Sequence, residues 1–123
     1  KELVAGTTLY LPIHADGALF SVGDGHGVQG DGEVCITAIE TGLIGTFELH
    51  MRHDMTLEWP MAETPTHFIT MAFDPDLDDA AKQALREMIG YTLCSLAADL
   101  RITQVVNGSK GVHVMLEKTH LAL

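Results

Sequence analysis

The chain has 123 residues, 46% hydrophobic and 20% charged, which is the composition of a globular protein and not of a disordered one. This length suits one domain, and such a chain buries roughly two-thirds of the surface that its unfolded form exposes. A net charge of −10 with only seven lysines and arginines argues against nucleic acid and against an anionic membrane surface as partners.

The first two-thirds of the chain is rich in strand formers separated by turn residues. The Asp16–Gly17 pair is a favoured hairpin turn. Alternation and β-branched residues predict strands over residues 7–13, 18–22, 33–40, 46–52, 57–61 and 67–73. We therefore expect a β-rich part over residues 1–73, an antiparallel sheet of barrel or sandwich type.

The hydrophobic period changes at Asp74. Asp76 is a good N-cap for a helix, and Gly90 is a plausible residue for that helix to stop at. A second helical segment is expected over residues 91–100 and a closing strand over residues 112–116. Strands first and helices later is typical of an α+β fold, with residues 74–123 as its α/β end.

The two cysteines bear on the cellular compartment. Cys35 and Cys94 lie far apart and show no zinc-finger spacing, so we expect buried free thiols in a reducing cytoplasm. No apolar run reaches the length of a membrane span, and no signal peptide is recognisable. Because the chain begins at Lys1 and enters a strand-like run almost at once, we expect a piece of a longer protein.

Residues 23–34, GDGHGVQGDGEV, hold five of the twelve glycines. Between them stand polar residues able to bind a metal, move a proton or orient a substrate: Asp24, His26, Gln29, Asp31 and Glu33. The run matches GxGxxG, but a dinucleotide site needs a helix after the glycines and a strand is predicted here. The spacing of the acidic residues does not fit an EF-hand either.

Extended chain places residues two apart on one face, so Asp24 would lie beside His26 and Asp31 beside Glu33. A hairpin would bring the four to one end of a sheet. Carboxylates and one imidazole can hold a catalytic zinc or a related ion, which activates water and polarises a carbonyl. The alternative is a hydrogen-bonded turn in which Asp and Gly serve backbone conformation.

Residues 11–34 have the form LPxxxxGALFSxGDxHxxQGDGEV, which resembles the signature of the acetamidase/formamidase family. Residues 96–107 and 112–118 resemble a later helix and turn and the closing strand of that family. The resemblance implies a metal-dependent amidohydrolase acting on linear amides. Such an enzyme hydrolyses the C–N bond of formamide or acetamide, with zinc as the expected metal and calcium as a possible one.

Carried over by position, the resemblance implies Asp24, His26 and Glu33 as metal ligands. It implies Glu33, Asp31 and Gln29 as catalytic residues, and His26 and Gly25 as substrate-binding residues. A general base must reach the attacking water within hydrogen-bond distance, and Glu33 is the expected base.

Two departures from the family pattern matter. Family chains are longer and carry a β-rich N-terminal part, so this chain resembles the C-terminal part of such an enzyme. The expected partners are a small amide, the N-terminal part of the same enzyme and further copies in a homo-oligomer. The family also has a longer stretch between the positions of Gly90 and Tyr91. Either this chain has a deletion there, or residues are missing from the sequence.

Two other functions stay open: a non-catalytic calcium- or ligand-binding β domain, and an inactive half that completes a site with another chain. A second possible cluster comprises His50, His53 and Asp54 near Glu48, with a polar strand end as its alternative. His113 is expected to be a packed or surface residue.

Overall fold

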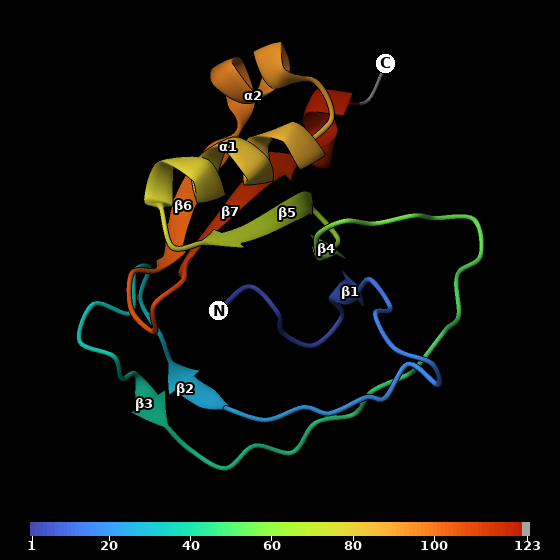
Figure 1. Ribbon diagram of the computed structural model, residues 1–123, viewed down its shortest axis with the longest axis vertical. Coiled ribbons are helices and arrows are strands. Elements are labelled where there is room, and N and C mark those ends of the chain that lie inside the picture. The colour runs from blue at the N-terminus through green and yellow to red at the C-terminus, as the bar shows by residue number, and fades with distance from the viewer. Residues whose placement is uncertain (122–123) are drawn as a thin grey trace.

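The computed structural model describes residues 1–121 and contains one large antiparallel sheet (Figure 1). Its strands, in spatial order, are β1 (Thr8–Tyr10), β4 (Met61–Glu63), β5 (His67–Asp74), β7 (Lys110–Glu117) and β6 (Asp99–Gln104). Helices α1 (Leu77–Glu87) and α2 (Tyr91–Ala97) follow β5, and a short 3-10 helix, η1 (Lys118–Leu121), follows β7. The α+β fold is therefore confirmed.

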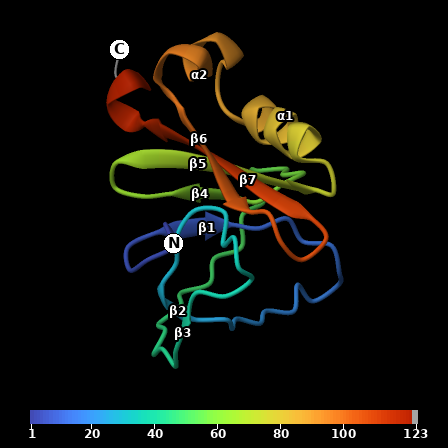
Figure 2. The same ribbon diagram turned by 90° about the vertical axis from the view of Figure 1, so that its left-hand side faces the viewer.

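A separate lobe connects β1 to β4. It carries the two-stranded sheet of β2 (His26–Val28) and β3 (Ile39–Glu40). In both views the helices and this lobe lie on opposite sides of the molecule, with strands of the large sheet between them (Figures 1 and 2). The glycine-rich run is thus held away from the helical layer.

The core lies between α1 and the central strands β5 and β7. Val112, Val114 and Leu116 alternate along β7 and are fully buried together with Ala80 and Ala84 of α1. The intervening residues of β7 face the other side of the sheet, where Met115 packs with Ile69 and Ala62. His113 belongs to this second face, away from the helices.

The start of α1 is confirmed, because the Asp76 side chain accepts hydrogen bonds from the backbone N–H groups of Asp78 and Asp79. The predicted stop at Gly90 is wrong, since α1 ends at Glu87 and Gly90 precedes α2 with φ of 78°. The helix predicted to reach Leu100 is also too long. The chain leaves α2 at Ala97 and forms β6 along the free edge of β7, so tertiary pairing overrides the helical pattern there.

Several predicted strands are wrong. Residues 18–22 and 46–52 form no strand, only Ile39–Glu40 remain of 33–40, and only Met61 remains of 57–61. Left-handed φ angles at Ala18, Leu19 and Glu33 break the extended conformation in this region. Strand propensity reflects packing on a neighbouring strand, and residues 18–22 and 46–52 pair with no strand within residues 1–121.

The two cysteines differ in burial. Cys94 is buried in the core, and burial raises the pKa of its thiol, whereas Cys35 is exposed and the expectation of burial is wrong there. Within the described range, neither α1 nor α2 has the length and apolarity needed to cross a bilayer.

Candidate functional site

The glycine-rich run places His26 on β2 directly opposite Glu40 on β3. Their side chains meet, with Nε2 of His26 3.0 Å from Oε1 of Glu40. Close approach of the backbone is needed beside them, because a Cβ at Gly25 would lie 2.9 Å from Cδ1 of Leu43 and 3.3 Å from the carbonyl oxygen of Thr41. Gly25 therefore shapes the hairpin that carries His26.

Three carboxylates converge on this imidazole, and with it they form what we call the His26 centre: Asp24, His26, Glu33 and Glu40. Nε2 of His26 lies 3.6 Å from Oδ1 of Asp24 and 4.0 Å from Oε1 of Glu33, in addition to the contact with Glu40. The side chains of His26 and Glu33 are only 12% and 9% exposed, whereas those of Asp24 and Glu40 are 83% and 55% exposed. The centre thus has a shielded inner side and an open outer side.

The donor set fits a divalent cation. Ligand atoms of Asp24, His26 and Glu40 all lie within 4.8 Å of one another. Desolvation acts to raise the pKa of Glu40, but hydrogen bonds from His26, Ala38 and Thr37 outweigh it and hold that pKa below its ordinary value. Three carboxylates around one imidazole repel each other, and a cation among them would relieve this repulsion.

The structure brings together the predicted metal ligands Asp24, His26 and Glu33, and it separates the predicted catalytic residue Asp31 from them. Oδ2 of Asp31 lies 2.8 Å from Nζ of Lys1. Ligand atoms of Asp31, Glu2 and His113 on β7 lie within 4.8 Å of one another. Partial burial acts to raise the pKa of Asp31, but the hydrogen bond and charge of Lys1 hold it below its ordinary value. Gln29 is half-buried on the same loop. The side chains that meet His26 are those of Asp24, Glu33 and Glu40, so Gln29 lies outside the His26 centre.

The reason for this separation is a tether at Gly32. Its N–H donates to the carbonyl oxygen of Ile102 at 2.7 Å, and its own carbonyl accepts from the N–H of Val105 at 3.0 Å. Because these bonds tie the loop to the end of β6, Asp31 lies with the large sheet and Glu33 with the His26 centre. The predicted pairing of Asp31 with Glu33 on one face does not form.

Sequence reasoning missed Glu40, which lies outside the glycine-rich run at the end of a predicted strand. Its acidic side chain on the strand after the glycine loop was a usable signal, because cross-strand neighbours of a hairpin share a face.

The second possible cluster, around His50 and His53, forms two separate exposed pairs. His50 lies 2.8 Å from Glu48, and Arg52 lies 2.7 Å from Asp54. The Arg52 hydrogen bond lowers the pKa of Asp54 to about 2. Among residues 1–121, neither group of three possible metal ligands includes His50 or His53.

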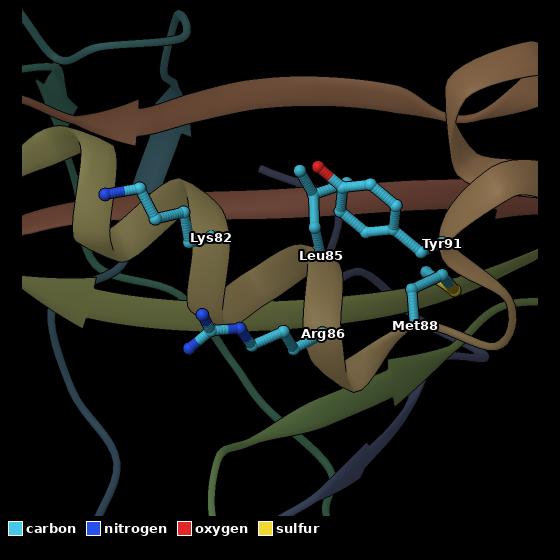
Figure 3. Close-up of a pocket in the computed structure, with 5 residues that line it drawn as sticks. All are labelled: Lys82, Leu85, Arg86, Met88 and Tyr91. Carbon is cyan, nitrogen blue, oxygen red and sulfur yellow. The ribbon is translucent and has the colours of Figure 1, made fainter.

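Two hollows have linings that include no residue of the His26 centre. One, of about 600 Å³, lies at the end of α1 and the start of α2 and is lined by Lys82, Leu85, Arg86, Met88 and Tyr91 (Figure 3). None of these residues belongs to the predicted site. The other, of about 410 Å³, lies along β6 and includes Asp31 and Arg101 in its lining.

A family profile described as the Acetamidase/Formamidase family matches residues 1–79, which include the whole His26 centre. The chain belongs to the acetamidase/formamidase family. The sequence resemblance is thereby confirmed.

Relatives of this acetamidase/formamidase chain include a predicted formamidase of Schizosaccharomyces pombe. It is 34% identical over 96 residues, which are 68% of this chain and 23% of the relative. A crystal structure of an acetamidase from Yersinia enterocolitica has a TM-score of 0.90 at 30% identity, over 96% of this chain and 40% of that one. An acetamidase from Bacillus halodurans has a TM-score of 0.82 at 32% identity, over 94% of this chain and 44% of that one. The chain therefore spans less than half the length of these relatives.

Proposed function

We propose that the His26 centre is the water-activating part of a hydrolase that cleaves the C–N bond of short aliphatic amides, formamide and acetamide. The observation that carries the proposal is the convergence of Asp24, Glu33 and Glu40 on Nε2 of His26, at 3.6, 4.0 and 3.0 Å. Family membership and the names of the relatives support the amide as substrate class.

Asp24, His26 and Glu40 would hold a divalent ion, zinc in the first place and calcium as the alternative, with Glu33 as a further ligand or as the base. Such an ion supplies a lowered pKa of its bound water and a polarised amide carbonyl. The mixed nitrogen and oxygen donors favour zinc, because calcium prefers oxygen ligands alone.

Glu33 is best suited to act as the general base, because its side chain is 9% exposed and faces the imidazole from the shielded side. It would take a proton from water as the water oxygen bonds to the carbonyl carbon, and return it to the amide nitrogen. The C–N bond then breaks to give a carboxylic acid and ammonia, and proton transfer between them yields carboxylate and ammonium. His26 and Gly25 remain the expected substrate-binding residues, and Gln29 a candidate for orienting the amide.

Asp31 takes a different part in this scheme. Its carboxylate contacts Lys1 and lies near Glu2 and His113, so we propose that it does not touch the substrate. The outer side of the centre is open at Asp24 and Glu40. We propose that this chain is the C-terminal part of the enzyme, and that its N-terminal part, or another copy in a homo-oligomer, closes the substrate pocket.

The test is ammonia release from formamide and acetamide, by this chain alone and by a protein that also carries the β-rich N-terminal part. Glu33→Gln should keep the fold and abolish turnover. Its control is Glu48→Gln, which removes an exposed carboxylate that also contacts a histidine. No turnover by the longer protein with zinc bound would refute the hydrolase, and calcium binding without turnover would favour the non-catalytic β domain. Full activity of this chain alone would refute the alternative that it is an inactive half that needs another chain to complete the site.

A further inference from the structure

We propose that Glu2, Asp31 and His113 form a second metal site, the His113 centre, which binds a divalent transition metal such as Zn²⁺. The three offer ligand atoms that all lie within 4.8 Å of one another. They come from the first residues of the chain, the glycine-rich loop and β7, so only the tertiary structure brings them together. The proposal does not depend on amide hydrolysis at the His26 centre.

The observation that carries it is the buried imidazole. His113 is 4% exposed, and its Nε2 is buried without a hydrogen-bond partner among the described residues. A buried polar atom left unpaired costs free energy, so such atoms are uncommon and need an explanation. Nε2 lies 3.6 Å from Oε2 of Glu2, too far for a good hydrogen bond. A bound cation would satisfy both atoms.

The other ring nitrogen has a hydrogen-bond partner on a neighbouring strand. Nδ1 of His113 lies 2.7 Å from Oγ1 of Thr103 on β6. Histidines that bind metals through one nitrogen generally donate the other N–H to an oxygen, which fixes the tautomer and the ring orientation. When Nδ1–H donates to Thr103, Nε2 carries the free lone pair and lies 3.6 Å from Oε2 of Glu2.

The spacing suits a small ion. Ligand atoms about 2.0–2.1 Å from a tetrahedral zinc lie roughly 3.3 Å apart, close to the 3.6 Å between His113 and Glu2. Asp31 would complete the set after a small side-chain movement. One imidazole and two carboxylates favour zinc or a similar transition metal over magnesium or calcium, which prefer oxygen ligands.

Two cations compete with the ion. Arg101 contacts Oε1 of Glu2 at 3.1 Å, which leaves Oε2 facing His113, so it can stay in place and orient the carboxylate. Nζ of Lys1 lies 2.8 Å from Asp31, and the backbone nitrogen of Lys1 lies 3.6 Å from Oε2 of Glu2. The ion must displace the Lys1 side chain, which sits at the surface on a flexible stem. Asp31 and Arg101 also line the hollow of about 410 Å³, whose lining includes neither Glu2 nor His113.

The experiment is a zinc titration of the metal-stripped chain, followed by the ¹⁵N NMR signals of the histidine rings. The Nε2 signal of His113 should shift and saturate by two equivalents of zinc, because the His26 centre is proposed to take up one of them. Glu2→Gln and Asp31→Asn should each weaken this binding at least tenfold. His67→Gln is the matched control, because His67 also contacts a threonine hydroxyl, at 2.8 Å, but belongs to neither ligand group in residues 1–121.

The ring of His26 reports separately on the first centre, so the two proposals can fail independently. An unchanged His113 signal at excess zinc would overturn the His113 centre, and this result needs no variant. Equal zinc affinity in the unmodified chain and in both carboxylate variants would overturn the ligand set. A shift at His113 without one at His26 would support this centre and count against a metal at the other.

Discussion

His26 and Glu40, fourteen residues apart in the chain, meet with 3.0 Å between Nε2 and Oε1. They are opposite neighbours in the β2–β3 ladder. Oε1 of Glu40 also faces Oγ1 of Thr37 and the N–H of Ala38, both at 3.4 Å. The carboxylate is therefore oriented from two directions, and the imidazole has a partner that the glycine-rich run does not contain.

Glu40→Gln should weaken zinc binding at the His26 centre by about 10-fold or more, because losing a carboxylate that only supports a metal ligand already costs about that much. The amide keeps the shape and removes the negative charge. Zinc titration followed through the His26 ring measures the effect, and Glu48→Gln is the control. Unchanged affinity would remove Glu40 from the ligand set.

Gly32→Ala should destabilise the protein by about 1–2 kcal/mol, the cost of a left-handed conformation for a residue with a Cβ. Gly32 has φ of 86°, and the added Cβ would lie 3.0 Å from Cγ1 of Val34. Thermal unfolding measures the loss. Hydrogen exchange at the Val105 N–H, which bonds to the Gly32 carbonyl, should become faster.

The matched control for this change is Gly30→Ala, because Gly30 has no left-handed φ and a Cβ added there would meet no other atom within 4 Å. It should change stability by less than about 0.5 kcal/mol. Equal effects of the two substitutions would show that the tether at Gly32 does not hold the loop.

Thr70→Val should cost about 1–3 kcal/mol, the penalty for leaving a buried carbonyl without its hydrogen bond. Thr70 is fully buried, and its Oγ1 donates to the carbonyl oxygen of Ala84 at 2.7 Å. The N–H of Met88 bonds to Leu85 at the end of α1, so it does not satisfy Ala84. Denaturant unfolding tests this. Thr119→Val, at an exposed threonine that donates to Glu117, should be nearly neutral.

Glu63→Gln should lower stability at neutral pH by up to about 1 kcal/mol, as expected for a partly exposed ion pair. Lys118 donates a hydrogen bond to Glu63 and, with the Tyr10 hydroxyl, holds the pKa of that carboxyl below its ordinary value. A lowered folded-state pKa stabilises the protein above the unfolded pKa, and this contribution disappears as the pH falls through the folded pKa. The two proteins should therefore converge in acid. A constant difference in unfolding free energy down to pH 2 would contradict the assignment.

Much of the helical half was predictable because its signals are local. The cap at Asp76 acts on N–H groups two and three residues away, so the sequence alone shows it. The strands at residues 67–73 and 112–116 were found because they are apolar enough to be buried whatever their partners are. The strand over Asp99–Gln104 was missed because only the free edge of β7 makes that segment extended.

The sequence by itself determined the family, the α+β class and the concentration of ligand-type side chains in residues 23–34, because motif, period and composition are read along the chain. Only the tertiary structure decided which of those side chains act together. Gly32 is hydrogen-bonded to Ile102 and Val105. As a result, Asp31 lies near Glu2 and His113, whereas Glu33 lies near His26. Strand pairing adds Glu40, and such pairings depend on which distant segments meet in the folded chain.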